Sequence, residues 1–210
     1  MTFPEQQRLL IFPCNGNGME ALDCLGTAYW LIGFIDDSVE KRDTEVQGYP
    51  VYGREALIRW PQARVLAVPG SPASYTLRAQ LIESLAIELE RFATVIHPSA
   101  RVSRLAVLGR NVLIMAGVVI TSNAVIGDHV CLLPNTVVHH DVIIGRWSLV
   151  GSQVTIAGHT RVGKNCYIGS GTSIMNGLNI GDGALVGMAS NVIREVAPGD
   201  KVAGNPARSI

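Results

Sequence analysis

An aliphatic residue recurs at every sixth position through the second half of the chain. The frame starts at Ile96 and reaches Val192 without an exception. Its members are Ile96, Val102, Leu108, Ile114, Ile120, Ile126, Leu132, Val138, Ile144, Val150, Ile156, Val162, Ile168, Ile174, Ile180, Val186 and Val192. Neither an α-helix nor a β-strand repeats with a period of six. This period is typical of a parallel β-helix.

A small or aliphatic residue follows each frame position by four, as at Ala100, Val118 and Ser148, and glycine often follows it directly, as at Gly145 and Gly163. In a parallel β-helix, three hexads form one triangular coil. The aliphatic side chain fills the interior, the small residue packs beside it, and glycine accepts the tight corner backbone. Each coil buries its apolar surface only against its neighbours, so we predict a stacked column over residues 96–193.

The chain before the column alternates between short apolar runs and longer mixed stretches. The predicted strands are "RLLIF" (8–12), "LIGFIDD" (31–37) and "RVLAVP" (64–69). The predicted helices are "MEALDCLGTAYW" (19–30), "GREALIRW" (53–60) and "PASYTLRAQLIESLAIELE" (72–90). Such alternation favours a parallel sheet with right-handed crossovers. We therefore expect a Rossmann-like α/β domain over residues 1–95, and a closing tail over residues 194–210.

Composition narrows the class of protein further. The chain has 210 residues, 48% of them hydrophobic and 16% charged, which is a globular balance. The net charge of zero disfavours nucleic acid or an acidic membrane as a partner. No apolar run has spanning length, and the N-terminal segment lacks the features of a signal peptide, so we expect a cytoplasmic protein. The cysteines lack CxxC spacing and are expected to be free, buried thiols: Cys14, Cys24, Cys131 and Cys166.

A glycine motif follows the first predicted strand. Gly16, Gly18 and Ala21 form a G-x-G-x-x-A pattern that opens a helix, and Asp36 ends the next strand. Glycine lets the backbone approach a phosphate, and the acid can accept hydrogen bonds from a hydroxyl or an imide N–H. A tight strand-to-helix turn is the alternative explanation. Because the domain is too short for a full dinucleotide fold, the motif indicates a mononucleotide-type ligand.

Three polar residues interrupt the column at one corner. With Val138 and Val142 inside, His139, His140 and Asp141 must face outward. An imidazole can take a proton at neutral pH, and a neighbouring carboxylate makes it a stronger base. A solvated turn is the alternative reading of the same three residues.

The column and its tail, Gly204-Asn205-Pro206-Ala207-Arg208, resemble the hexapeptide-repeat transferases, whose column is a left-handed β-helix. With a short α/β domain in front, the whole chain resembles the sugar acetyltransferases that modify nucleotide-linked amino sugars and sialic acids. The resemblance implies acetyl-CoA as co-substrate, a nucleotide sugar as acceptor and a homotrimer with acyl-CoA sites between adjacent columns.

The resemblance also implies roles in the column. The family's catalytic segment is His followed by Glu or Asp and an apolar stretch ending in Ile-Gly, which matches His140 as the base and Asp141 as its carboxylate. The backbone N–H of Gly158 matches the donor to the oxyanion. Acetyl-CoA is expected to contact the backbone near Gly158, Ser170 and Met188.

In the first domain, the resemblance implies that the nucleotide of the acceptor is bound. The matching residues are a glycine loop, an acidic pair and a glycine in a later loop, namely Asn15, Gly16, Asn17, Asp36, Asp37 and Gly70. The chain departs from the family at Pro13-Cys14, where a glycine and a small residue are more usual, and at Pro69, where the loop is usually glycine-first.

Three further histidines and one leucine also carry expectations. His159 either lines the thioester channel or is an ordinary corner residue. His129 is expected on an outward corner one coil before the site, and His97 needs no role. Leu149 stands where related enzymes often carry a second histidine.

The predicted reaction is N-acetylation of a UDP- or dTDP-linked 4-amino-deoxysugar for glycan biosynthesis, by direct transfer without an acyl-enzyme. One alternative is O-acetylation of a sialic acid or another sugar hydroxyl. Another is a non-catalytic, nucleotide-binding column protein. A zinc-dependent carbonic anhydrase is set aside because the chain lacks the His-x4-His pair of those enzymes, so no metal is expected.

Overall fold

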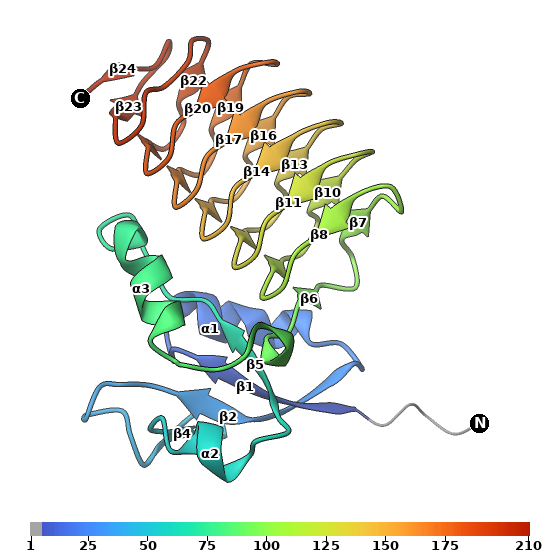
Figure 1. The fold of residues 1–210 in the computed structure, drawn as a ribbon, viewed down its shortest axis with the longest axis vertical. Coiled ribbons are helices and arrows are strands. Elements are labelled where there is room, and N and C mark those ends of the chain that lie inside the picture. The colour runs from blue at the N-terminus through green and yellow to red at the C-terminus, as the bar shows by residue number, and fades with distance from the viewer. Residues whose placement is uncertain (1–5) are drawn as a thin grey trace.

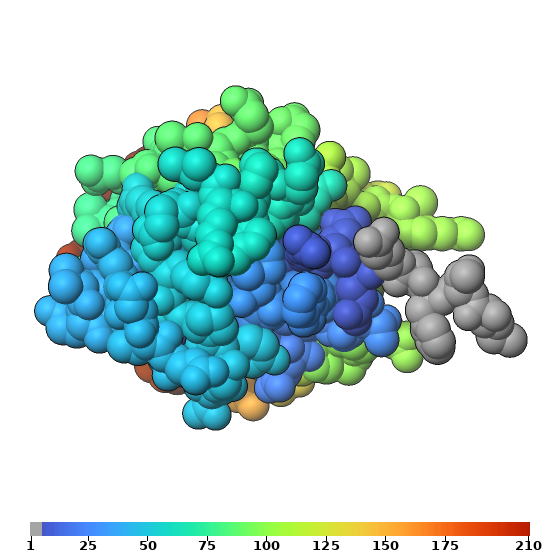
Figure 2. Space-filling model, turned by 90° about the horizontal axis from the view of Figure 1, so that it is seen from below, coloured from blue at the N-terminus to red at the C-terminus, as the bar shows by residue number. Residues whose placement is uncertain are grey.

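The computed structural model describes residues 6–210. Residues 1–5, which open the predicted first domain and the segment judged to lack a signal peptide, lie outside the described residues. A small α/β domain lies along one side of a long column of stacked coils (Figure 1). Seen from below, the α/β domain hides most of the column (Figure 2).

The N-terminal domain is a five-stranded sheet of order β3-β4-β2-β1-β5. Its strands are β1 (Gln7–Phe12), β2 (Tyr29–Ile35), β3 (Thr44–Val46), β4 (Tyr49–Tyr52) and β5 (Arg64–Ala67). The three predicted strands are confirmed as β1, β2 and β5, and they pair in parallel. The β3–β4 hairpin was not predicted. The chain goes from β1 to β2 on one side and returns to β5 on the other, so a ligand crevice is expected where β1 and β5 end.

The helices of this domain are shorter than predicted. They are α1 (Gly16–Glu20), η1 (Ala21–Cys24), α2 (Ala56–Arg59), η2 (Tyr75–Leu77), α3 (Arg78–Glu83) and η3 (Leu89–Arg91). The predicted helix over 19–30 is wrong in its second half, because Gly26 has a φ of +53° and Tyr29 begins β2. The predicted helix over 72–90 is interrupted in the same way by Ala86, with a φ of +51°.

The column consists of two-residue strands separated by corners. They are β6 (Val95–Ile96), β7 (Arg101–Val102), β8 (Val107–Leu108), β9 (Leu113–Ile114), β10 (Val119–Ile120), β11 (Val125–Ile126), β12 (Cys131–Leu132), β13 (Val137–Val138), β14 (Ile143–Ile144), β15 (Leu149–Val150), β16 (Thr155–Ile156), β17 (Arg161–Val162), β18 (Tyr167–Ile168), β19 (Ser173–Ile174), β20 (Asn179–Ile180), β21 (Leu185–Val186) and β22 (Asn191–Val192). The tail adds β23 (Lys201–Ala203) and β24 (Arg208–Ser209).

Each strand pairs in parallel with the strand eighteen residues away, as in Val119 with Val137. The prediction of three hexads per coil is therefore confirmed, and the fold is a left-handed parallel β-helix. Its three faces are the sheets β7-β10-β13-β16-β19-β22, β8-β11-β14-β17-β20 and β6-β9-β12-β15-β18-β21, which we call faces 1, 2 and 3. The tail strands β23 and β24 extend face 3.

The predicted interior frame holds from Ile114 to Val192, where each member is at most 2% exposed. The start of the frame differs, because Ile96 is 41% exposed and Val102 and Leu108 are only partly buried. These residues lie in the first coil, which has no preceding coil to cover it. Burying an aliphatic side chain contributes about 1.5–3 kcal/mol, so the stacked frame is the main source of the column's stability.

Face 3 of the column packs against the N-terminal domain. Its outward residues Leu113, Cys131 and Leu149 join one buried cluster with Leu9 and Leu66 of the sheet. Leu149 is thus part of the core between the N-terminal domain and the column, which explains why this position carries a leucine. No helix among the described residues has the length and apolar character needed to cross a membrane.

Candidate active site

The His-His-Asp corner lies between β13 and β14, on the edge where faces 1 and 2 meet. Val138 and Val142 are completely buried, so the corner side chains point away from the interior as predicted. Asp141 adopts a φ of +59°, which turns the chain from one face to the next. The imidazole of His140 is about half exposed, with 52% of its side chain accessible. The corner therefore presents its polar groups to a ligand.

Asp141 fixes the orientation of His140. The Nδ1 of His140 lies 2.8 Å from Asp141 Oδ2, and Asn123 Nδ2 donates to Asp141 Oδ1 at 3.1 Å. The hydrogen bond to His140, and then that to Asn123, lowers the pKa of the Asp141 carboxyl below its usual value. An ionised carboxylate only accepts hydrogen bonds, so Nδ1 carries the proton. The Nε2 of His140 is then left to accept a proton from a ligand.

Asn123 was missed in the sequence analysis. It lies eighteen residues before Asp141, which places it on the same edge one coil earlier. The hexad frame contained this information, because residues eighteen apart stack on one another.

Gly158 lies against the ring of His140 from the next coil. A Cβ atom at Gly158 would be 2.7 Å from both Cε1 and Nε2 of His140, so only glycine leaves room for the imidazole in this position. Within residues 6–210, the backbone N–H of Gly158 has no hydrogen-bond acceptor, whereas the next N–H, of His159, donates to His140 O at 3.1 Å. The structure thus brings His140, Asp141 and Gly158 close together.

A second imidazole stands beside the first. The ring of His159 is 5.0 Å from that of His140 in an edge-to-face arrangement, and its Nδ1 is 3.9 Å from Asp141 Oδ2. One ligand atom from each of His140, Asp141 and His159 lies within 4.8 Å of the others, a set that could hold a divalent transition metal.

Ser170 and Met188 lie on a different edge of the column. They follow β18 and β21, where faces 3 and 1 meet, whereas Gly158 follows β16 on the edge of His140. Ser170 Oγ accepts a hydrogen bond from Ser152 N at 3.0 Å, and Met188 is 68% exposed. One chain therefore does not bring all three predicted acetyl-CoA contacts together.

In the N-terminal domain, the loops after β1 and β5 are joined. Asn15 caps α1, with its Oδ1 accepting from Gly18 N at 2.8 Å. Asn17 Nδ2 donates to Val68 O at 3.3 Å and to Gly70 O at 3.4 Å. Gly16 has open space where a side chain would stand. The predicted glycine loop thus lies beside the loop that follows β5, at the carboxyl ends of β1 and β5.

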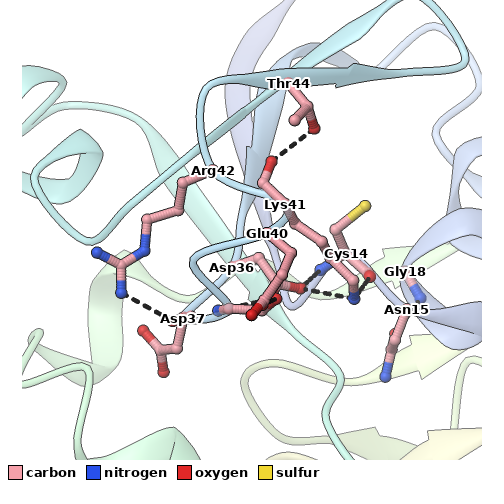
Figure 3. A network of polar contacts seen from close by, with 10 residues as sticks. Cys14, Asn15, Gly18, Asp36, Asp37, Glu40, Lys41, Arg42 and Thr44 are labelled. Atoms are coloured by element: carbon pink, nitrogen blue, oxygen red, sulfur yellow. Dashed lines mark hydrogen bonds and ion pairs between the residues drawn. The ribbon is translucent and has the colours of Figure 1, made fainter.

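Asp36 holds this loop in place (Figure 3). The carboxylate is 5% exposed; its Oδ2 accepts from Cys14 N at 3.0 Å and Lys41 Nζ at 3.2 Å, and its Oδ1 accepts from Ser38 N at 3.0 Å. Lys41 Nζ also donates to Cys14 O at 2.7 Å. The carboxylate predicted to bind the ligand therefore accepts hydrogen bonds from the protein itself. These bonds hold the end of β2 against the glycine loop.

Asp37, the second predicted acid, forms a two-pronged ion pair. The Nε and Nη2 of Arg54 each lie 2.7 Å from an Asp37 oxygen, and this interaction lowers the pKa of the Asp37 carboxyl. Its side chain is 43% exposed, so it remains accessible from solvent.

His129 lies on a corner of the column as expected, but on a different edge from His140. It is only 7% exposed, lies edge-on to Phe92 at 5.0 Å and stacks parallel to Trp147 at 6.1 Å. Burial lowers its pKa to about 4, so the imidazole is neutral at physiological pH. Its corner, where faces 2 and 3 meet, is covered by the N-terminal domain. The expectation of four free, buried cysteines is confirmed.

The N-terminal domain touches two of the column's three edges. Tyr75 and Arg78 donate hydrogen bonds to backbone carbonyls on the edge between faces 2 and 3. Cys24 lines a cavity together with Met115 and Pro134, which lie on the edge between faces 3 and 1. His140 occupies the third edge. In one chain, the glycine loop and His140 are thus on opposite sides of the prism.

Family models match this column. The model "Bacterial transferase hexapeptide (six repeats)" matches residues 105–139 and 123–158, and "Hexapeptide repeat of succinyl-transferase" matches residues 159–191. Residues 105–191 thus match the hexapeptide-repeat transferases. A search of the curated proteins finds no match for this transferase.

Solved structures extend the similarity over the whole transferase. The acetyltransferase domain of PglB from Neisseria gonorrhoeae FA1090, in complex with acetyl coenzyme A, is 27% identical, with a TM-score of 0.85 over 98% of this chain and 100% of that one. PerB from Caulobacter crescentus, in complex with CoA and GDP-perosamine, is 25% identical, with a TM-score of 0.82 and full coverage of both chains. WeeI from Acinetobacter baumannii AYE, at 24% identity and a TM-score of 0.82 over 98% of this chain and 100% of that one, has the same fold.

Proposed function

We propose that this hexapeptide-repeat transferase uses acetyl-CoA to acetylate the amino group of a nucleotide-linked 4-amino-deoxysugar, in the synthesis of a glycan. Transfer is direct, with His140 as general base. The observation that carries this proposal is the pair His140–Asp141, seated over Gly158 on an exposed edge. The similarity to PglB, whose structure holds acetyl coenzyme A, supports the co-substrate.

The first step is deprotonation of the amine. A sugar amine is largely protonated at neutral pH and cannot attack a thioester until it has lost a proton. His140 Nε2 accepts that proton, which frees the nitrogen lone pair for attack, and Asp141 stabilises the resulting imidazolium through Nδ1. When the tetrahedral intermediate collapses, the imidazolium gives its proton to the departing CoA sulfur. The neutral imidazole then takes the second proton from the nitrogen and releases it to solvent.

The second requirement is a donor for the developing oxyanion. The Gly158 N–H, which has no protein acceptor among the described residues, can donate to it. A cysteine nucleophile has no support here, because all four thiols are buried. Trapping an acetylated cysteine during turnover would contradict direct transfer.

The nucleotide of the acceptor is assigned to the crevice at the ends of β1 and β5. Ligands of parallel α/β sheets bind at such a point, outside the carboxyl ends of the strands. Gly16, Asn17 and Gly70 lie in the loops at this point, and Asp36 holds the glycine loop. PerB holds a GDP-linked sugar, so GDP joins UDP and dTDP among the nucleotides to be compared.

The positions of the proposed nucleotide site and of His140 support a homotrimer. Since the glycine loop and His140 lie on opposite sides of one prism, an acceptor bound by one copy would meet His140 of a neighbouring copy. The outward residues of face 2 beside the catalytic edge include exposed apolar side chains, Val107 at 60% and Val125 at 38%. Light scattering after gel filtration would test the trimer, and a monomer with full activity would contradict it.

The function is tested by incubating the protein with acetyl-CoA and a panel of acceptors. The panel contains UDP-, dTDP- and GDP-linked 4-amino sugars, with sialic acid as the hydroxyl acceptor, and free CoA thiol and acetylated product are both measured. We expect turnover of one class of nucleotide amino sugar. Turnover of sialic acid alone would favour O-acetylation, and binding without turnover would favour the non-catalytic alternative.

We predict that Asp36→Ala raises the KM for the acceptor by roughly tenfold. Loss of the carboxylate leaves the Cys14 N–H and the Lys41 ammonium without their partner, and hydrogen bonds to a charged group are worth about 1.5–3 kcal/mol. The KM for acetyl-CoA should stay within about twofold, because Asp36 is remote from the column corners. Glu45→Ala, an exposed acid on β3, is the matched control. An equal defect for acetyl-CoA would mean that the two domains have been assigned wrongly.

We predict that dialysis against EDTA leaves kcat unchanged. The proposed base, its carboxylate and the oxyanion donor are all groups of the chain, although His140, Asp141 and His159 could hold a metal. Activity lost with EDTA and restored by added Zn²⁺ would overturn the metal-free mechanism.

A further inference from the structure

Arg78 is the largest completely buried side chain in the described structure. It begins α3, and no ion pair found within residues 6–210 involves it. Burial lowers the pKa of its guanidinium, which reflects the cost of removing this cation from water. A buried charge without a carboxylate is retained only where its hydrogen bonds are all directed to defined partners.

The partners of Arg78 are three backbone carbonyls from two parts of the molecule. Its Nη1 donates to Pro69 O, in the loop after β5. Its Nε donates to Trp147 O at 2.9 Å and its Nη2 to His129 O at 2.7 Å, on two successive coils of the column. The planar guanidinium thus fixes one loop of the N-terminal domain against one edge of the column.

The loop held by Arg78 is part of the proposed nucleotide crevice. Gly70 follows Pro69 and has a φ of +119°, and a Cβ there would be 2.8 Å from Arg78 Cγ, so the loop backbone lies directly on the arginine side chain. Asn17 Nδ2 donates to Gly70 O at 3.4 Å and so links this loop to the glycine loop. A shift of Arg78 would therefore displace both loops.

A second contact holds the end of β5 to the same edge. Asn111 is 1% exposed; its Oδ1 accepts from Ala67 N at 2.7 Å and its Nδ2 donates to Ala67 O at 2.7 Å. Asn111 Nδ2 also lies 3.0 Å from His129 Nδ1. The back wall of the crevice is thus held by the column and not only by its own sheet.

We propose that Arg78 is a positioning residue for the acceptor: it holds the Pro69–Gly70 loop on the column in the shape that the nucleotide requires. This inference rests on the proposed function of the crevice. It predicts that acceptor binding depends on an arginine that no ligand can touch, because the side chain is completely buried.

The test compares Arg78→Met with Arg91→Met. Arg91 also donates to three backbone carbonyls, those of Ala63, Leu57 and Trp60, but all of them belong to the N-terminal domain and none to the crevice loops. For Arg78→Met we expect the acceptor KM to rise about 10–100-fold, since small displacements of binding groups have effects of this size. The KM for acetyl-CoA should stay within about twofold. Arg91→Met should lower the melting temperature and leave both KM values unchanged.

Arg78→Lys keeps the positive charge and most of the aliphatic chain but lacks the planar guanidinium. It should therefore bind the acceptor better than Arg78→Met does, although less well than the wild type. If Arg78→Met does not fold, Arg78→Lys alone provides the test. Equal rises in both KM values, a fall in kcat alone, or the same KM rise in Arg91→Met would overturn the inference. If the wild type acetylates no nucleotide amino sugar, the proposed function fails. Calorimetry with UDP, dTDP and GDP then still reports whether Arg78→Lys weakens nucleotide binding.

Discussion

Replacing His140 with alanine is expected to lower kcat by about 10²–10⁴-fold, the usual contribution of a general base. The protonated amine then has no group to take its proton before it attacks the thioester. The fold should be retained, because the side chain of His140 is half exposed and packs little. Steady-state kinetics with a thermal melt of the same sample measures both effects.

Neighbouring variants sharpen this test. Asp141→Asn should cost less than His140→Ala, because the imidazole remains but is held and polarised less well. His139→Ala should be nearly silent. With an amine acceptor, the loss in His140→Ala should shrink as the pH rises, since more of the amine is already free. If His139→Ala is inactive and His140→Ala is active, the catalytic base is His139 and not His140. If both variants are fully active, the corner is a surface turn without a catalytic role.

Gly158→Ala is expected to lower kcat by about 10²-fold, although it adds only one methyl group. The new Cβ would lie 2.7 Å from two ring atoms of His140, so the imidazole must move away from Gly158 and from its contact with Asp141. A misplacement of about 1 Å can cost a catalyst this much. Initial rates at saturating acetyl-CoA and acceptor measure the effect.

Two further variants separate this displacement from damage to the coil. Gly177 lies on the same edge one coil later, with a φ of +73° and open space around it, so Gly177→Ala should cost about 1–2 kcal/mol of stability but leave kcat unchanged. In the background of His140→Ala, Gly158→Ala should have no further effect on kcat, because the group that it displaces is gone. Additive losses in the double variant would mean that Gly158 acts independently of His140.

The column could be predicted almost completely from sequence, because one local rule generates it. A fixed step of six places Val138 and Val142 inside and sends His140 outward, and a step of eighteen stacks Gly158 on His140. The geometry of the candidate site follows from these two steps, since every corner sits in the same way on the corner below it. Asn123 could have been found by the same counting.

The rest depends on contacts between distant segments, which no local pattern encodes. Asp36 ends a strand as predicted, but only the fold reveals that Cys14 and Lys41 occupy its carboxylate. His129 was expected only to lie on an outward corner, because the sequence does not state which edge of the column is covered. The sequence did contain one indication of the covered face. The outward residues of face 3 are apolar or aromatic at intervals of eighteen, which indicates that this face is covered: Leu113, Cys131, Leu149, Tyr167 and Leu185.

The burial of the cysteines also bears on how this protein can be assayed. Burial raises the pKa of Cys24 and Cys166 to about 11 and of Cys131 to about 12, and it raises the pKa of Cys14 as well. Disulfide reagents such as DTNB react with the thiolate, so the native protein should give almost no colour with them at pH 8. The released CoA can then be followed continuously against a flat background, and a slow rise in colour without substrates would report unfolding of the enzyme.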